Sequence, residues 1–200
     1  MDIETTAQQI YDTLTTDGLA VVPTAAGYGI LAMGRSGVER IYALKGRPTS
    51  KPCVTVTTWP IFDQVSCEVD PDTRAFIRQT LTFAPLAVIA RVRPNAPLLA
   101  RLDPFVLSQC TQAGTIASFH GASALVTRVA EFVVDVGTIP MPGGVRLATT
   151  ILDLASGRFL REGVQFPRIA REWAEHPASR RGRSAGAAAT ARSASHPSPA

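Results

Sequence analysis

The chain has 200 residues, of which 46% are hydrophobic and 18% are charged, a balance typical of a globular domain rather than of a disordered or fibrous chain. No apolar run approaches the ~20 residues that a membrane-spanning helix needs, and the acidic N-terminus is unlike a signal or transit peptide. Three widely separated cysteines, Cys53, Cys67 and Cys110, favour neither a disulfide framework nor a cysteine zinc site. We therefore expect a soluble, cytoplasmic protein without membrane contact.

The C-terminal segment differs in composition from the rest of the chain. The four arginines after His176 have no acidic residue among them, and they account for the whole net charge of +4. Because this segment consists mainly of Ala, Ser, Pro, Gly and Arg without apolar periodicity, we expect it to be disordered. The sequence predicts one folded domain over residues 1–170 and a tail over 171–200. The tail is either inert or a weak contact for RNA or an acidic partner.

Two helices and three short strands are predicted in the first 60 residues. Thr6–Gln9 has the spacing of a capping box, and the helix that it begins should end at Gly18. Ser36–Glu39 repeats this spacing, and its helix should carry Lys45 at the C-terminal end. The buried faces predicted for the two helices are Ala7, Ile10, Tyr11 and Leu14, and Val38, Ile41 and Tyr42. Strands are predicted over residues 19–23, 30–33 and 53–58, with a loop over 24–29.

The rest of the chain continues to alternate between strands and helices. Asp70 or Asp72 should cap a helix that runs to about Leu81. Further strands are predicted over residues 86–92, 114–119, 132–137, 149–154 and 158–163, with a helix over 122–132. Because strands and helices interleave without a strict βαβ repeat, the predicted class is α/β with a twisted, mixed open sheet and flanking helices.

The segment LKGRPTSKP places three cations, Lys45, Arg47 and Lys51, within seven residues. Cations at a helix C-terminus offset the macrodipole, and a solvated turn would also tolerate them. Pro48 and Pro52 favour a binding site instead, because they stiffen the backbone and leave the cations less freedom to lose on binding. One arginine fork and two lysine point charges suit phosphate or carboxylate groups.

Several other polar residues have both a structural and a functional interpretation. Thr24 can be a hydroxyl at a strand end, and Thr149 and Thr150 can be plain β-formers. His120 lies between a predicted strand and a predicted helix, where a general acid or base could stand. Without a paired Asp or a second metal-spaced His, a capping or surface role is favoured for it. The sequence has no legible Ser/His/Asp set, Cys/His set or metal site.

Two blocks of the sequence match a known pattern in the right order. GLAVVPTAAGYGILA and VERIYALKGRPTSKPCVTV contain an apolar strand, Pro-Thr, Tyr-Gly and Lys-x-Arg-Pro-x-x-Lys-Pro. VVDVGTIPMPGGVRLATTILDLASGRFLREG contains a Thr149-Thr150 pair, then Asp153, and a closing Arg161 and Gly163. Over roughly residues 17–163 the chain thus resembles the YrdC/Sua5 family of L-threonylcarbamoyladenylate synthases. The resemblance implies a YrdC-like fold with a concave basic cleft.

The resemblance implies a nucleotidyltransferase that forms an (L-threonyl)carbamoyl-adenylate from ATP, bicarbonate and an amino acid, for the modified adenosine beside tRNA anticodons. ATP and Mg²⁺ are the implied cofactors. A carboxylate-like oxygen attacks the α-phosphate, and fixed cations in a dry cleft would offset the gathering negative charge. The residues implied for catalysis are Lys45, Arg47 and Lys51. Those implied for substrate binding are Thr24, Tyr28, Ser50, Thr149, Thr150 and Arg161.

The sequence departs from the family pattern at two places. Ala25, Ala26 and Gly27 stand where the family has an acidic residue and a hydroxyl, and the chain has no Ser-Ala-Asn turn for the nucleotide. Ser118 and His120 lie where a replacement for that turn could stand. Two alternatives follow: a repurposed YrdC-fold enzyme that performs carbamoyl transfer or another reaction on a small metabolite, or a non-catalytic module that binds an anion or RNA.

Overall fold

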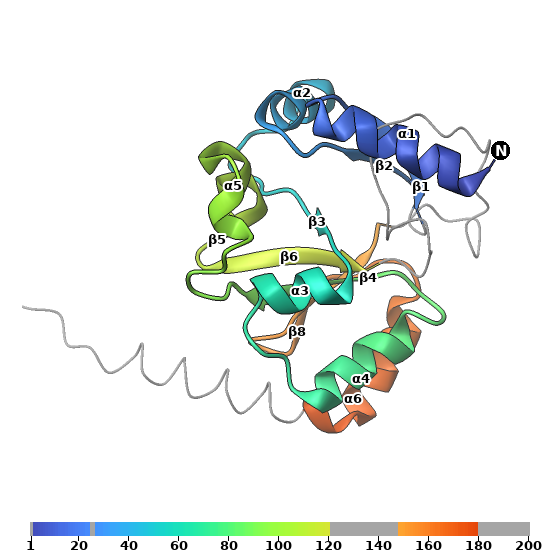
Figure 1. Cartoon of the computed structure of the whole chain (residues 1–200). Coiled ribbons are helices and arrows are strands. Elements are labelled where there is room, and N and C mark those ends of the chain that lie inside the picture. The colour runs from blue at the N-terminus through green and yellow to red at the C-terminus, as the bar shows by residue number, and fades with distance from the viewer. Residues whose placement is uncertain (1, 25–26, 121–147, 180–200) are drawn as a thin grey trace, which may run out of the picture.

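A computed structural model describes residues 2–24, 27–120 and 148–179. Within them, a helical unit with a two-stranded hairpin stands beside a larger sheet with its own helices (Figure 1). The predicted α/β class with a mixed open sheet is confirmed, although the described strands form two sheets instead of one. None of the described helices is long and apolar enough to cross a bilayer.

The N-terminal part, which we call the hairpin unit, consists of two helices and an antiparallel strand pair. Its elements are α1 (Ile3–Thr15), β1 (Ala20–Thr24), β2 (Gly27–Leu31) and α2 (Arg35–Lys45). Ile10 and Leu14 of α1 pack on Ala20 and Val22 of β1, as the apolar face of the predicted helix indicates. The predicted burial of Tyr11 is wrong, since this side chain is 52% exposed.

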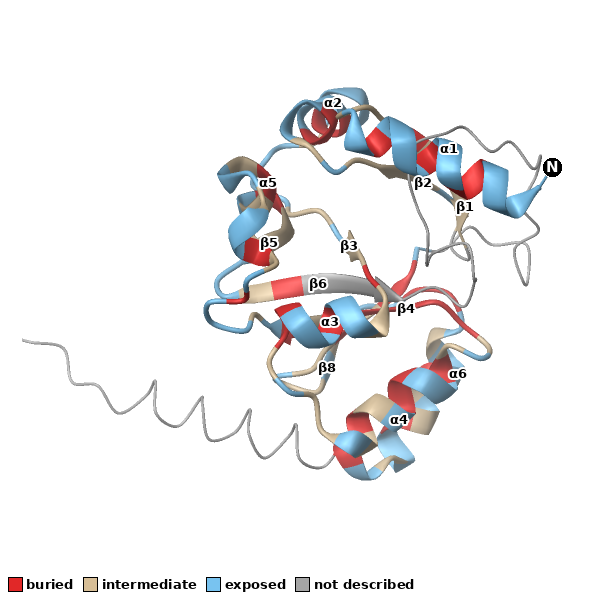
Figure 2. Cartoon of the chain, viewed as in Figure 1, coloured by how far each residue is buried: buried red, intermediate tan, exposed pale blue. Residues whose placement is uncertain are grey.

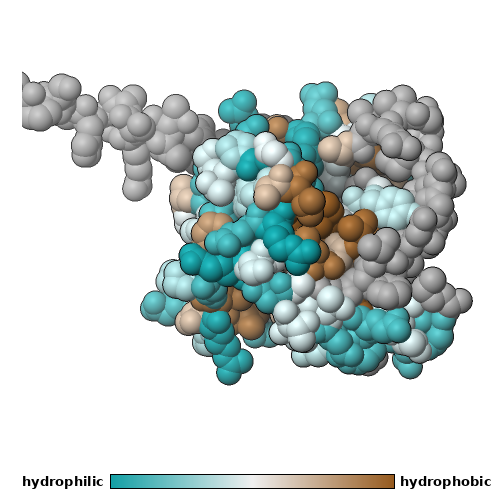
Figure 3. Space-filling view, turned by 90° about the horizontal axis from the view of Figure 1, so that it is seen from above, coloured by the Kyte–Doolittle hydropathy of each residue, from teal (hydrophilic) through white to brown (hydrophobic). Residues whose placement is uncertain are grey.

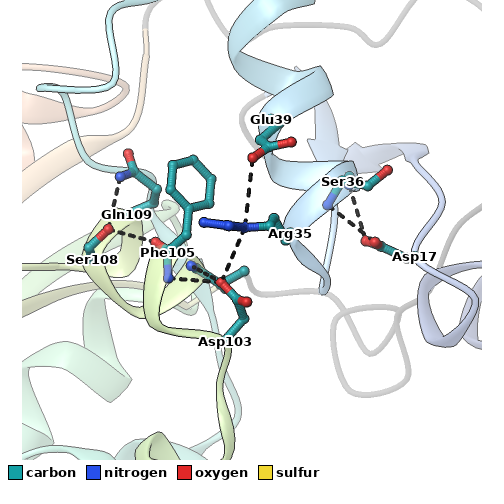
Figure 4. Close-up of polar contacts among 10 residues, drawn as sticks. Asp17, Arg35, Ser36, Glu39, Asp103, Phe105, Ser108 and Gln109 are labelled. Atoms are coloured by element: carbon teal, nitrogen blue, oxygen red, sulfur yellow. Dashed lines mark hydrogen bonds and ion pairs between the residues drawn. The ribbon is translucent and has the colours of Figure 1, made fainter.

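Both helices of the hairpin unit begin earlier than the capping boxes predict. Asp2 caps α1 and accepts a hydrogen bond from the Thr5 amide at 3.0 Å. The first turn of α2 is capped from a distance, because the Asp17 carboxylate accepts hydrogen bonds from the amides of Ser36 and Gly37 (Figure 4). A carboxylate that is close in space satisfies these amides as well as a neighbour in sequence would.

The larger sheet has the strand order β3-β6-β4-β7-β8, with β5 paired to β6. Its strands are β3 (Thr55–Val56), β4 (Leu86–Arg91), β5 (Thr111–Gln112), β6 (Thr115–His120), β7 (Thr150–Asp153) and β8 (Arg158–Arg161). β4 runs antiparallel to β6 and parallel to β7, so the sheet is mixed. The predicted strand over 53–58 is mostly wrong, because only two of its residues pair with β6. β2 also begins three residues before its predicted start, inside the predicted loop.

The main core lies between the larger sheet and two helices, α4 (Pro71–Thr80) and α6 (Phe166–Glu175), which lie side by side in Figure 1. Asp70 caps α4, which is one of the two caps that the sequence leaves open. Phe76 of α4 packs against Trp173 of α6 with their ring centroids 4.7 Å apart. Figure 2 shows that both helices have a buried and an exposed side, as expected of helices that cover one face of a sheet.

The folded part of the chain extends beyond residue 170. α6 crosses the predicted domain boundary, and Trp173 and Ala178 belong to the main core. Ile169 and Trp173 are four residues apart and lie on one helical face, but the charged residues around them obscure this spacing in the sequence. The predicted boundary at residue 170 is therefore wrong. Residues 180–200, which make up most of the predicted tail, lie outside the described residues.

Besides α6 and β5, three short helices are absent from the sequence-based prediction. They are α3 (Trp59–Val65), α5 (Pro104–Cys110) and the 3₁₀-helix η1 (Leu99–Arg101). α3 and α5 each have a proline in their first turn, which is compatible with a helix start but is equally common in loops. Helices of two turns depend on tertiary packing, so local sequence does not reveal them. The predicted helix over 122–132 and the strand over 132–137 lie outside the described residues.

Candidate functional site

A cavity of about 1080 Å³ lies between the hairpin unit and the larger sheet. One side is lined from α1, β2, α2 and the segment after α2, and the other from β3, α3, α5 and β6, together with Thr149 and Arg161. Seen from above, hydrophobic and hydrophilic side chains adjoin on the surface of the molecule (Figure 3). Pockets for small-molecule ligands usually have volumes of about 300–1,000 Å³, so this cavity is large enough for a ligand of nucleotide size.

Contacts between α2 and α5 link the hairpin unit to the part of the chain that carries the larger sheet (Figure 4). Arg35 of α2 has its Nε 3.7 Å from an Asp103 carboxylate oxygen, and its guanidinium lies 5.0 Å from the centre of the Phe105 ring. The two charged side chains are about half exposed, so the ion pair adds little stability. The ion pair instead helps to fix the position of α2 relative to α5, and both helices line the cavity.

The described residues that line the cavity include three cations and no carboxylate. The cations are Lys45, Arg47 and Arg161, from two segments that are more than a hundred residues apart in the sequence. Like charges gathered in a concave wall raise the local concentration of anions. The arrangement therefore favours a ligand that carries phosphate or carboxylate groups.

The basic segment after α2 is folded into a tight turn. Gly46 ends α2 in the left-handed conformation with φ 53°, and the Arg47 amide donates to the Tyr42 carbonyl at 3.0 Å. The Arg47 side chain donates through Nη2 to the Pro52 carbonyl at 2.6 Å. The Tyr42 hydroxyl donates to the Lys51 carbonyl at 2.7 Å. The backbone of the turn is thus held from inside by two side chains, in addition to its prolines.

The structure brings six of the predicted site residues to the cavity and leaves others away from it. Those that line it are Thr24, Tyr28, Lys45, Arg47, Thr149 and Arg161. Ser50 and Lys51 are exposed and do not line it, so the prediction that all three cations of the turn face one ligand is not supported. The Lys51 amide donates to the Pro48 carbonyl at 3.1 Å, so a turn lies between Arg47 and Lys51.

The structure contradicts the prediction that Thr150 contacts a substrate. This residue is fully buried, and its hydroxyl accepts a hydrogen bond from the Gly163 amide at 3.1 Å and donates to the Val164 carbonyl at 3.2 Å. The hydroxyl thus acts both as a donor and as an acceptor within the protein. The hydroxyl therefore holds the segment after β8 against the start of β7.

Two threonines at the cavity have bonds that position their neighbours. The Thr149 carbonyl accepts a hydrogen bond from Arg161 Nε at 2.8 Å, which orients that guanidinium. The Thr24 hydroxyl donates to the Gly27 carbonyl at 2.6 Å across the end of the hairpin. Ser118 and His120 belong to β6, where they pair with Val88 and Leu86 of β4, so the prediction that His120 lies beyond the strand is corrected.

Sequence reasoning missed the residues of the opposite wall. Thr57 and Gln109 line the cavity, are almost fully buried, and have side-chain oxygens without a hydrogen-bond partner among the described residues. The Arg47 Nε is also buried and has no hydrogen-bond partner among the described residues. Buried polar atoms normally have partners, so their gathering at one cavity marks a place for water or a polar ligand. In the sequence, Thr57 belongs to a predicted strand over 53–58, and this pattern does not indicate a binding residue.

Replacing Tyr42 by phenylalanine is expected to lower the free energy of unfolding by about 1 kcal/mol, because one buried hydrogen bond to the basic turn is lost. Burial, with the hydrogen bond from the Cys53 thiol, raises the pKa of Tyr42, so the phenol remains a neutral donor at neutral pH. Urea unfolding followed by circular dichroism measures the change. Tyr11→Phe is the matched control, since Tyr11 is half exposed. Equal unfolding midpoints for Tyr42→Phe and the unchanged protein would contradict this account of the turn.

Comparison with known proteins gives a structural likeness only. No protein-family model and no curated protein matches the chain. It is similar to a hypothetical protein from Streptococcus mutans, with a TM-score of 0.65 and 16% identity over 84% of this chain and 91% of that one. It is also similar to Sua5 from P. abyssi complexed with L-threonine, with a TM-score of 0.59 and 16% identity over 80% of this chain. E. coli YciO gives a TM-score of 0.57 and 13% identity, covering 82% of this chain and 91% of YciO.

These likenesses identify the fold. The chain has the YrdC/Sua5-like fold, in a form that diverges strongly in sequence from the solved examples. It spans about half of Sua5, since the match covers 54% of that protein. The fold expected from the two sequence blocks is confirmed.

Proposed function

We propose that the chain is a nucleotidyltransferase that joins the adenylyl group of ATP to a carbamoylated amino acid. One observation carries the proposal: Lys45, Arg47 and Arg161 line a single cavity whose described residues include no carboxylate. Both partners of such a reaction are anions, and a site of this charge would hold them together against their repulsion. The likeness to a Sua5 structure complexed with L-threonine supports an amino acid as one reactant.

In this reaction the nucleophile is an oxygen of the substrate, so the protein's residues position the reactants and offset their negative charge. The amino group and bicarbonate form a carbamate with loss of water, and a carbamate oxygen attacks the α-phosphorus of ATP. The bond from the α-phosphorus to the bridging oxygen breaks, and pyrophosphate leaves. Arg161, oriented by its bond to the Thr149 carbonyl, would pair with a planar carboxylate or phosphate group. Lys45 would act as a point charge on the phosphates.

Mg²⁺ would enter this cavity bound to the phosphates of the nucleotide. The described residues contain no group of three or more His, Cys, Asp or Glu side chains that could hold a metal ion. Mg²⁺ keeps several waters and is often bound through substrate phosphates, so nucleotide oxygens would supply its ligands. When bound, the ion would offset charge on the leaving pyrophosphate.

Replacing Lys45 by alanine is expected to weaken ATP binding about 10- to 100-fold, the loss of one charge-assisted hydrogen bond. Isothermal titration calorimetry of the full chain with ATP and Mg²⁺ measures the effect. Lys51→Ala is the matched control, because Lys51 is also an exposed lysine and lies six residues away, but does not line the cavity. Both variants should melt within about 1 °C of the unchanged protein, as exposed substitutions do. Equal losses for the two lysines would point to unspecific attraction and contradict the proposed site.

Release of pyrophosphate tests the reaction itself. The full chain incubated with ATP, bicarbonate and single amino acids should release pyrophosphate at a rate that depends on both bicarbonate and the amino acid. Binding of ATP without any release would favour the non-catalytic module. The contact with RNA predicted for the tail involves residues 180–200, outside the described part of the chain, and remains a prediction, as does the cytoplasmic location.

A further inference from the structure

Exposed apolar side chains gather around the cavity. In the described part of the chain, eight large hydrophobic side chains are exposed. Five of the eight line the cavity: Tyr11, Tyr28, Met33, Val54 and Ile61. Their exposed fractions range from 39% to 52%. Scattered apolar residues need no explanation, whereas a cluster rimmed by polar groups marks a binding surface.

These five residues come from separate parts of the fold. Tyr11 projects from α1, Tyr28 and Met33 lie on and just after β2, Val54 precedes β3, and Ile61 belongs to α3. Neither α1 nor α3 needs these residues for its packing, since each helix buries other apolar side chains, Ile10 and Leu14 in α1 and Phe62 and Val65 in α3. The apolar surface is therefore additional to the core. It lines the same cavity as the three cations.

A ligand that matches this lining has an anionic end and an apolar body. Phosphates and a carboxylate would satisfy Lys45, Arg47 and Arg161. The adenine ring of ATP would cover only part of an apolar surface that is built from separate segments, and a small polar side chain would leave the rest in contact with water. A bulky alkyl or aryl group would cover it and be removed from water in doing so. The tyrosines add flat faces that suit an aromatic ring.

We propose that the amino acid handled at this cavity has a bulky apolar side chain, such as that of leucine or phenylalanine, and that it is preferred over threonine. The inference rests on the proposed function, in which an amino acid is carbamoylated and adenylated. Its carboxylate and carbamate would lie toward the cations, and its side chain toward Tyr28, Val54 and Ile61. The apolar wall would thus determine specificity, while the cations would bind the anionic groups common to all amino-acid substrates.

The test compares amino acids under identical conditions. The full chain is given ATP, Mg²⁺, bicarbonate and either L-phenylalanine, L-leucine or L-threonine, and kcat/KM is obtained from pyrophosphate release. The expected value for phenylalanine or leucine is at least tenfold higher than for threonine. A value for threonine equal to or above both of the others overturns the inference and leaves the proposed function intact.

A pair of matched variants tests the wall itself. Ile61→Thr should raise KM for the apolar amino acid several-fold more than it raises KM for threonine. Ile3→Thr is the control, because Ile3 is also exposed in the first turn of a helix but does not line the cavity. Equal changes for both amino acids in Ile61→Thr overturn the inference.

Complete absence of pyrophosphate release with every amino acid would contradict the proposed function rather than decide the specificity. Equilibrium dialysis of radiolabelled L-phenylalanine and L-threonine against the full chain then decides it. Tighter binding of phenylalanine, lost in Ile61→Thr and kept in Ile3→Thr, supports the apolar wall. Equal or weaker binding of phenylalanine overturns it.

Discussion

Replacing Trp173 by alanine is expected to lower the melting temperature by about 6–20 °C. Removal of a buried tryptophan costs about 3–5 kcal/mol, and each kcal/mol corresponds to about 2–4 °C in a domain of this size. Trp173 packs on Phe76, is only 6% exposed, and donates from its indole to the Gly157 carbonyl at 2.9 Å. The substitution would leave a cavity between α4 and α6 and remove the bond that ties α6 to the turn between β7 and β8.

Thermal unfolding followed by circular dichroism measures this effect. Arg171→Ala is the control, because Arg171 lies on the same helix and is exposed, and its melting temperature should change by less than about 2 °C. A small change for Trp173→Ala would mean that α6 contributes little to the core. The domain would then end near residue 170, as the composition of the sequence predicts.

Replacing Gly163 by alanine is expected to lower the melting temperature by about 6–12 °C, which corresponds to a cost of about 3 kcal/mol. A Cβ at this buried position would overlap the Ala148 carbonyl oxygen and the backbone nitrogen of Thr150. No flexible side chain is available to yield, so one of the two backbone segments must move. The Gly163 amide would also lose its good geometry to the Thr150 hydroxyl.

The same substitution should affect the ligand site indirectly. The segment that Gly163 approaches carries the Thr149 carbonyl, which orients Arg161. We therefore expect Gly163→Ala to weaken ATP binding as well, measured by calorimetry below the melting temperature. Glu162→Ala, at the exposed neighbouring position, should change neither quantity appreciably. Unchanged stability in Gly163→Ala would show that the close approach of the two segments is not required.

Part of the site was predictable because it is contiguous in sequence. Lys45 and Arg47 stand at the end of an amphipathic helix and before a proline, and this local pattern suffices to place two cations at fixed spacing on one turn. Lys51 shows the limit of the same argument. Its charge equals that of its neighbours, but the hydrogen bonds from Tyr42 and Arg47 to the carbonyls of Lys51 and Pro52 form only in the folded chain, and the charge pattern does not specify them.

The rest of the site was not predictable because it depends on residues that meet only in the folded chain. Arg161 reaches the cavity through a bond to the Thr149 carbonyl, twelve residues earlier, and adjacent Thr150 faces inward. Thr149 and Thr150 are both buried, and only the folded structure shows that Thr149 lines the cavity while the Thr150 hydroxyl forms hydrogen bonds within the protein. The apolar wall likewise combines side chains from α1, from β2 and the segment after it, from the segment before β3, and from α3.

By itself, the sequence determined the α/β class, the two candidate caps of α4, four strands of the larger sheet and the basic turn, because each depends on periodicity or on residues adjacent in the chain. Only the tertiary structure decided where the domain ends and which two of the three cations line the cavity. It also decided which polar side chains form hydrogen bonds within the protein instead of facing the cavity. The physical reason is that a buried contact is selected by the free energy of the whole packed arrangement. Asp17 capping a helix that begins eighteen residues later is such a contact, since neither residue type nor local spacing specifies that it will be there.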